Sequence, residues 1–388
     1  MEFFVFNDEE KAFKEKVTRL AREKIKPLAQ KYGETNDVPQ EIVDVMAEGG
    51  LFRVLFPKEY GGEGVSAVKL CIAREELTQV SLVADVTLAM QGLGGYPIVL
   101  AGKEEQKKKY LPKLAGGELL ATYALTEPAA GSDVAGITSF AVREDDQYCL
   151  NGIKRFISNG YRADIGVVFA KTDKGKGNKG ISAFIYEKGM KGLTIRRRID
   201  LIAPHDSVEL EFKDCYLPGA NLLGEENGGF KVAMATLDLL RMSVGAASVG
   251  TAQAALNMAL KFSLERKTFG QPISGYQGIS FKLAEMATEL DAARLLVYRA
   301  ADLKDKGSGR VTKESSMAKY YATEMAGRVV DKAVQIHGGL GVTRGMGVEV
   351  ERLFREARPI RVYEGTTEIQ KLVIATILLK EVEKKEGE

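Results

Sequence analysis

The sequence predicts an α+β protein, mainly α, in which a helical domain, a β domain and a helical bundle follow one another. Apolar side chains first recur at helical spacing, short β-rich runs separated by turn residues follow, and helical spacing then returns. These changes place the expected domains at 1–118 (helical), 119–229 (a β barrel or sandwich) and 230–388 (a four-helix bundle).

The helical domain is expected to open at Asp8 with an amphipathic helix that Pro27 breaks. Further helices are expected over 40–49 and 67–90, and a charged helix ending at Pro112 closes the domain. In the β domain, Asn151-Gly152 and similar clusters separate the short runs as turns. The expected strands are 138–142, 148–150, 155–158, 166–170, 181–186, 193–195 and 208–212. The expected bundle helices are 231–267, 272–304, 311–337 and about 366–384.

Composition narrows the class of protein. The balance of 55 basic against 53 acidic residues predicts no nucleic-acid partner and no attraction to an anionic membrane. Cys71, Cys149 and Cys215 are widely spaced and indicate free thiols in a reducing compartment. With only two histidines, His205 and His337, no metal site is expected. The N-terminus has no signal-peptide order and the apolar stretches look too short to span a bilayer, so a cytoplasmic protein is expected.

Glu364 lies in the most informative segment, 362–370, where an apolar residue and Tyr363 lead into a carboxylate, followed by a Gly-Thr break. A carboxylate at such a kink between apolar neighbours is a candidate base, because desolvation raises its pKa toward neutral pH. The alternative is that Glu364 only caps the next helix, since Glu-Gly-Thr before an apolar run is an ordinary helix start.

Two β-domain segments carry further candidates. In 123–133, Gly131 and Ser132 allow backbone N–H groups to approach an anion or carbonyl closely, although such a cluster also marks a plain tight turn. In 154–160, an aromatic residue alternates with a hydroxyl, which suits stacking on a planar ring but also an ordinary half-buried strand.

Taken together, four motifs resemble the acyl-CoA dehydrogenase family, in the same order along nearly the whole chain. They are TEPAAGSDVAG at 126–136, RKTFGQPISGYQ at 266–277, QIHGGLG at 335–341 and YEGTTEIQ at 363–370. The resemblance implies FAD as cofactor, an acyl-CoA thioester as substrate, an electron-transferring flavoprotein as electron acceptor, and a homotetramer built as a dimer of dimers.

The resemblance also implies roles for individual residues. Glu364 matches the catalytic base, flanked by Tyr363 and Gly365 at the substrate. Positions around the flavin ring are matched by Tyr123, Leu125, Thr126, Phe156 and Ser158, with Gly131 and Ser132 near the pyrophosphate and Ser132 also near the acyl-CoA. The adenylate end, bound across a subunit boundary, is matched by Arg266, Phe269, Gln277, Gln335, Gly338 and Gly339. Thr366 and Glu368 match the adenosine diphosphate portion, and Asp238 and Arg241 match the CoA chain.

The chain also departs from the family pattern. Some relatives place the base just before the arginine matched by Arg241, and Leu240 there cannot act as one. The segment around 340–350 is longer than usual, which puts the local loop in doubt. Phe156 stands where tryptophan is common, so ring stacking is expected without an indole N–H.

Asp85 is the residue that sets this chain apart. It lies in an apolar helical stretch, where a carboxylate is costly unless paired or protonated. By resemblance this helix lines the acyl pocket, so Asp85 is a tentative second acid or base for an alicyclic substrate such as cyclohexane- or cyclohexene-carboxyl-CoA. The resemblance also leaves open a different flavoprotein on the same fold, namely an oxidase, a desulfinase, a reductase or a binding protein.

Overall fold

The computed structural model describes residues 5–346 and 349–386 and confirms a mainly helical protein with a β-sheet domain in the middle of the chain. The chain divides into two compact units. Unit 1 contains Met1–Ala21, Ala67–Ser81 and Arg241–Glu388, and unit 2 contains Arg22–Ser66 and Leu82–Leu240. The division into 1–118, 119–229 and 230–388 stays a prediction, because the N-terminal helical segment is shared between the two units.

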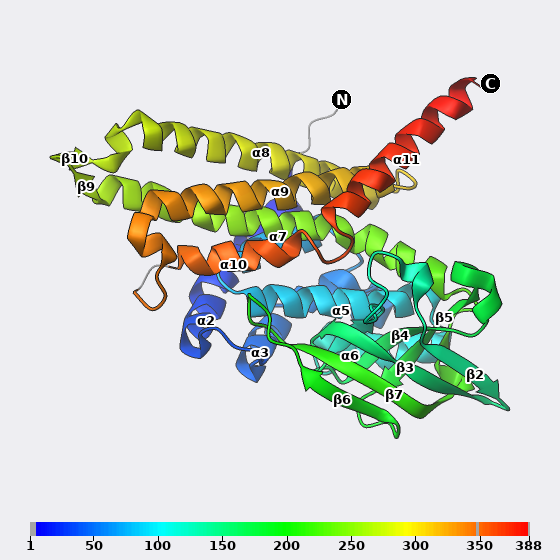
Figure 1. Cartoon of the computed structure of the whole chain (residues 1–388). Helices are drawn as coiled ribbons and strands as arrows, with labels where there is room; N and C mark the ends of the chain where they lie inside the picture. The colour runs from blue at the N-terminus through cyan, green and yellow to red at the C-terminus, as the bar shows by residue number, and fades with distance from the viewer. Residues whose placement is uncertain (1–4, 347–348, 387–388) are drawn as a thin grey trace. The chain divides into compact units, whose positions relative to one another are not determined.

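Unit 1 is built from helices. Its elements are α1 (Asp8–Leu20), α4 (Ala67–Thr78), the larger part of α7 (Gly229–Glu265), α8 (Gln277–Asp305), α9 (Thr312–His337), α10 (Val350–Ile360) and α11 (Thr367–Glu386). Helix α9 is central, because α8, α10 and α11 all pack against it (Figure 1). Buried small residues allow this close packing; at Gly245, for example, a Cβ would lie 2.8 Å from the Val297 side chain.

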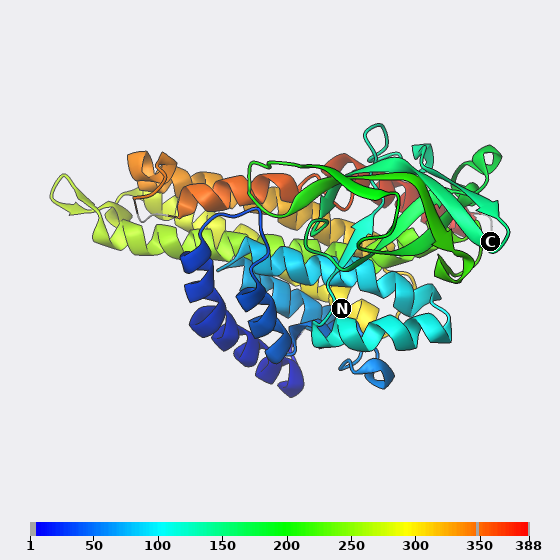
Figure 2. The same ribbon diagram turned by 90° about the horizontal axis from the view of Figure 1, so that it is seen from below.

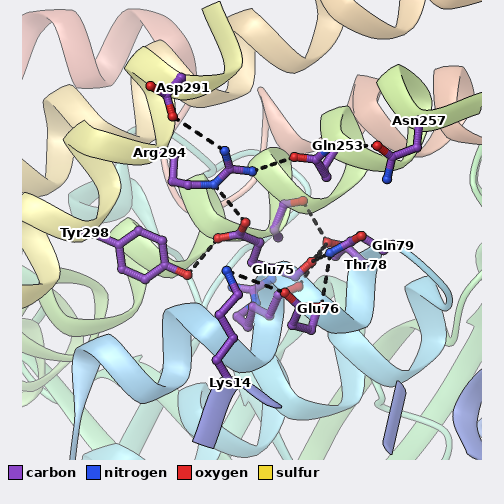
Figure 3. A network of polar contacts seen from close by, with 12 residues as sticks. Lys14, Glu75, Glu76, Thr78, Gln79, Gln253, Asn257, Asp291, Arg294 and Tyr298 are labelled. Carbon is purple, nitrogen blue, oxygen red and sulfur yellow. Dashed lines mark hydrogen bonds and ion pairs between the residues drawn. The ribbon is translucent and has the colours of Figure 1, made fainter. Parts of the chain in front are cut away.

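A polar network fixes α4 within unit 1 (Figure 3). The buried carboxylate of Glu75 accepts hydrogen bonds from Arg294 Nε at 3.0 Å and from Tyr298 Oη at 2.7 Å, both on α8. Arg294 also donates to Gln253 on α7. Because a buried charge is tolerated only when paired and hydrogen-bonded, this network specifies how α4, α7 and α8 meet.

Unit 2 contains a mixed sheet of eight strands. The strands are β1 (Ala121–Ala124), β2 (Phe140–Glu144), β3 (Gln147–Ser158), β4 (Ile165–Lys171), β5 (Ile181–Glu187), β6 (Leu193–Arg198), β7 (Ser207–Pro218) and β8 (Leu222–Leu223). Their order is β6-β7-β3-β2-β4-β5-β8, and β1 pairs in parallel with β4. Tyr186 on β5 contacts Phe212 on β7 with ring centroids 5.4 Å apart, although these strands are not neighbours, so the sheet folds over its apolar core.

The remaining helices of unit 2 are α2 (Lys26–Tyr32), α3 (Gln40–Glu48), α5 (Leu82–Ala101) and α6 (Glu104–Gly116). Helix α5 packs on β1 and β4, and α6 packs on α5; both are drawn in cyan in Figure 2. Gly94 brings α5 onto β1, since a Cβ there would lie 2.6 Å from the Ala121 Cβ.

Several local predictions were wrong. The helix expected over 67–90 is two helices, because α4 ends at Thr78 and Ser81, a residue type that favours helix starts, precedes α5. Pro27 lies in the first turn of α2, where its missing N–H costs nothing, instead of breaking the structure. Asn151-Gly152 lies inside β3 at a register shift and not between two strands.

Helix α10 was not predicted, and residues 347–348 of the longer loop before it lie outside the described part of the chain. The apolar stretches are also longer than expected. Within the described residues, α5 and α7 are long and apolar enough to cross a membrane, although 83% and 72% of their most apolar windows are buried inside the protein. Apolar core helices of this length pass the same test, so the finding is weak evidence for a membrane span.

Candidate active site

The segment that carries Glu364 is a tight loop between α10 and α11. Glu364 has a φ of 53° and Gly365 a φ of 93°, so both adopt the left-handed conformation. A glutamate in this region is strained by about 1–3 kcal/mol and persists only where surrounding contacts hold it. The helix cap is Thr366, whose hydroxyl accepts a hydrogen bond from the backbone N–H of Ile369. The rival interpretation, that Glu364 serves only as this cap, therefore loses its support.

Contacts from α9 and α11 hold both ends and the middle of this loop. Gln370 Nε2 donates to the carbonyls of Glu364 at 3.3 Å and Gly365 at 3.0 Å. The Thr367 hydroxyl donates to Glu324 on α9 at 2.6 Å, and Glu324 also pairs with Arg361 at 3.5 Å. Glu364 is partly buried in this setting. The loop therefore presents its carboxylate from a backbone that is fixed at several points.

Further predicted residues lie around this loop in unit 1. Tyr363 and Thr366 are partly buried, and Glu368 is exposed on the first turn of α11. Its own backbone N–H and the Thr366 hydroxyl hold the pKa of Glu368 below the ordinary value. Arg241 is buried on α7, which suits a cation that meets a ligand away from bulk water.

Asp238 and Leu240 belong to the part of α7 that lies in unit 2. Asp238 is partly buried there, and Leu240 is buried with 1% of its surface exposed. An aliphatic side chain at 240 cannot accept a proton, which leaves Glu364 as the candidate base among these two positions.

The residues predicted at the flavin ring lie together at one end of β1 and β3 in unit 2. Tyr123 and Leu125 are buried, and Tyr123 packs on Phe169 with ring centroids 4.9 Å apart. Thr126 is partly buried, and its carbonyl accepts from the backbone N–H of Arg155 on β3. This bond places the start of the TEPAAGSD loop beside the strand that carries Phe156 and Ser158.

Phe156 fits a site for a planar ring. Its side chain is 55% exposed on a strand and its φ is 58°, so a strained backbone presents a largely uncovered aromatic face. Ser158 lies two residues further on, where its hydroxyl meets Nε2 of His205 at 3.3 Å. Since Nδ1 of His205 lies 3.1 Å from the Ala203 carbonyl, which can only accept, Nδ1 carries the proton and Nε2 accepts from Ser158. Burial lowers the pKa of His205, which favours this neutral ring.

The glycine-containing loop after β1 is anchored by a buried ion pair. Lys154 Nζ on β3 lies 2.7 Å from Glu127 Oε1 and also donates to the Leu125 carbonyl at 3.1 Å. Glu127 further accepts from Thr138 and from the backbone N–H of Ser139. Beyond this anchor, Gly131 and Ser132 are exposed, as a loop that contacts a ligand requires.

The residues expected at the adenylate end form an exposed group at one end of unit 1. A short hairpin of β9 (Lys267–Thr268) and β10 (Gln271–Pro272) carries Phe269 at its tip, 98% exposed and with a φ of 50°. Stacking of Phe262 on His337, with centroids 4.4 Å apart, brings the hairpin end of α7 beside the glycine-rich end of α9. The exposed members of this group are Arg266, Gln277, Gln335, Gly338 and Gly339.

Asp85 is fully buried on α5 in unit 2, with none of its surface exposed. A carboxylate at such a position is either structural or functional, since burial alone would disfavour it.

Family comparisons agree with this arrangement. The descriptions "Acyl-CoA dehydrogenase, N-terminal domain", "middle domain" and "C-terminal domain" match residues 7–118, 122–215 and 227–379. An acyl-CoA dehydrogenase of Bacillus subtilis is 43% identical over 366 residues, covering 94% of this chain and 96% of that protein. The chain belongs to the acyl-CoA dehydrogenase family.

Members of this family are FAD-dependent oxidoreductases that act on CH–CH bonds. The CarC subunit of the caffeyl-CoA reductase-Etf complex of Acetobacterium woodii is 44% identical over 351 residues, covering 89% of this chain and 92% of that subunit. The structure of butyryl-CoA dehydrogenase from Megasphaera elsdenii superposes with a TM-score of 0.92 at 39% identity, covering 98% of this chain and all of that one (100%).

Sequence reasoning missed four residues that organise the site: Glu127, Lys154, His205 and Lys319. Each acts through a partner distant in sequence, such as Lys154 with Glu127 across 27 positions. The available signal was a charged residue between apolar neighbours, as at Lys319 after Met317 and Ala318, which marks an ion that burial would make costly.

Proposed function

We propose that this acyl-CoA dehydrogenase removes the α-proton of an acyl-CoA thioester through Glu364 and forms the enoyl-CoA. The observation that carries the proposal is the strained, multiply anchored loop that presents the partly buried Glu364 carboxylate. A base held rigidly and shielded from water is suited to a weakly acidic α-proton, because little reorganisation is needed during the transfer.

FAD is the proposed cofactor. When bound, its flavin ring accepts the β-hydrogen as hydride, so that the proton on Glu364 and the hydride balance the new C=C bond. The exposed Phe156 and the neighbouring Ser158 are the residues proposed to contact the ring, with Tyr123, Leu125 and Thr126 behind them. Exposed Gly131 and Ser132 are proposed to approach the pyrophosphate through their backbone N–H groups.

The chain is proposed to act as a homotetramer, with the adenylate end bound by Arg266, Phe269 and Gln277 of a neighbouring copy. The support is exposure: Phe269 is almost completely exposed within one chain. Large apolar side chains on α7, α8 and α11 are also exposed, which favours coverage by further copies. They are Leu264, Phe281, Leu295, Leu372, Leu379 and Val382.

An electron-transferring flavoprotein is the proposed acceptor, because the CarC relative is a subunit of a reductase-Etf complex. A cytoplasmic location is proposed from the three cysteines, which are free and buried, as in a reducing compartment.

The proposal is tested by anaerobic titration of the purified flavoprotein with straight, branched, aromatic and alicyclic acyl-CoAs. Bleaching of the flavin absorbance by at least one member of the panel is expected, with the enoyl-CoA as product. No bleaching with any of them would contradict the proposal, and rapid oxygen consumption by the reduced protein would indicate an oxidase instead.

An alicyclic acyl-CoA is a second candidate substrate class, favoured by the buried carboxylate of Asp85 on α5. Such a group can transfer a proton at a ring carbon, in addition to Glu364 at the α-carbon. Asp85→Asn should then slow turnover of cyclohexane- or cyclohexene-carboxyl-CoA by at least 100-fold, roughly the contribution of a general acid or base, while straight-chain turnover changes little. Unchanged rates on both substrate types would discard this role.

A further inference from the structure

Lys319, on helix α9, is a charged residue in a fully buried position, with none of its surface exposed. Its ammonium donates to the carbonyl oxygen of Gly365 at 2.8 Å. A buried ammonium carries a large desolvation cost, so for stability alone an apolar side chain of similar length would serve better here. The lysine is therefore explained by what it contacts.

The carbonyl that Lys319 contacts belongs to the residue after Glu364. Gln370 Nε2 donates to the same oxygen at 3.0 Å, so two donors from α9 and α11 converge on it. A carbonyl held from two sides fixes the peptide plane between residues 365 and 366. This in turn restricts Gly365 and the left-handed backbone of Glu364, which would otherwise relax.

We propose that Lys319 is a positioning residue for Glu364, holding the loop backbone through Gly365 and supplying a positive charge that favours the ionised carboxylate. The inference rests on the proposed role of Glu364 as the base. It assigns to α9 a part in the reaction although Lys319 itself is not placed at the substrate.

The charges around Lys319 support this assignment. Burial lowers the pKa of Lys319 to about 8, and the charge of Glu364 is the largest of the effects that raise it again. Glu324 on α9 and Glu368 on α11 act in the same direction, whereas Arg241 on α7 opposes them. Because electrostatic coupling is mutual, a carboxylate that favours protonated Lys319 is itself favoured in the ionised state by that lysine.

The decisive variant is Lys319→Met, which keeps the length of the side chain and removes both the charge and the donor. We expect kcat to fall on the order of 100-fold, since a small displacement of a catalytic group has an effect of that size. KM for the acyl-CoA and the flavin content should stay near the wild-type values, because Lys319 is not placed at the substrate or the flavin. The acid limb of the kcat profile should move to higher pH, because Glu364 loses the cation that favours its ionised form.

Lys313→Met is the matched control. Lys313 is also on α9, but its ammonium forms a surface ion pair with Glu381 and lies away from the loop. This variant should show wild-type kcat and an unchanged pH profile, since surface pairs contribute little.

A folded, flavin-loaded Lys319→Met enzyme with wild-type kcat and acid limb would overturn the inference. If Lys319→Met does not fold, Lys319→Arg decides the question. Arginine keeps its charge throughout the accessible pH range, so activity should persist to higher alkaline pH than in the wild type. An alkaline limb in the same place as the wild type would contradict the role of the charge.

Failure of this inference differs from failure of the proposed function. If Glu364→Gln retained turnover, the base assignment itself would be wrong. If Glu364→Gln is inactive while Lys319→Met is fully active with an unchanged profile, only the role of Lys319 is wrong.

Discussion

The buried ion pair between Lys154 and Glu127 gives the sharpest stability prediction, for the variant Lys154→Met. The side chains are 0% and 2% exposed, and their atoms lie 2.7 Å apart. Removing the lysine leaves a buried carboxylate without its cation, which typically costs about 3–5 kcal/mol. Glu127 keeps hydrogen bonds from Thr138 and Ser139, so the lower end of that range, about 3 kcal/mol, is expected.

The pH dependence provides an independent check of the same pair. The pKa of Glu127 is lowered to about 2; burial opposes this shift, and the charge of Lys154 is the largest effect that favours it. A depressed folded-state pKa contributes stability above the unfolded value, and that contribution is lost as pH falls toward about 2. Without Lys154 the folded pKa is higher, so the stability difference between wild type and variant should narrow as pH falls from about 5 to about 2.

The assay is urea unfolding of the FAD-saturated proteins, followed by circular dichroism at several pH values. The double variant Lys154→Met with Glu127→Gln is the matched partner, because it removes both charges and should recover part of the lost stability. A loss below about 1 kcal/mol in Lys154→Met, or a stability difference that does not narrow in acid, would refute the reasoning.

Three further predictions concern the cofactor and assembly. His205→Phe removes the acceptor for the Ser158 hydroxyl, so the midpoint potential of bound flavin should shift, and the same substitution in a Ser158→Ala background should have no such effect. Phe269→Ala removes an almost fully exposed ring at the hairpin tip and should weaken FAD retention in dialysis without lowering the melting temperature of the apoprotein; unchanged retention would count against the adenylate role. Leu379→Glu places a charge on an exposed apolar position of α11 and should shift the homotetramer toward smaller species in analytical ultracentrifugation; an unaltered assembly would exclude this face from the interface.

Much of the fold could be predicted because local pattern and chain order carried the information. Alternating runs predicted β4 and β5 to within a residue of their observed ends, and the long helices α7 to α9 followed from apolar periodicity. Boundaries failed where a single residue type has two uses. Pro27 both breaks helices and begins them, and Asn151-Gly152 marks both turns and bulges.

The candidate site was predicted less completely, because its supporting contacts join residues far apart in sequence. Glu364 was recognisable from its immediate neighbours, whereas Lys319 reaches Gly365 across 46 positions and periodicity does not register such a pair. The strained φ values at Phe156, Phe269 and Glu364 could not be predicted either, since none of these residue types favours the left-handed conformation.

Rapid mixing of the Glu364→Gln flavoprotein with an acyl-CoA that bleaches the wild-type flavin tests the central claim most directly. Glutamine keeps the shape of the side chain but cannot take the α-proton, so flavin content should match the wild type while the bleaching rate falls at least 100-fold, about what general-base catalysis contributes. Bleaching of the variant at the wild-type rate would contradict the assignment of Glu364 as the base.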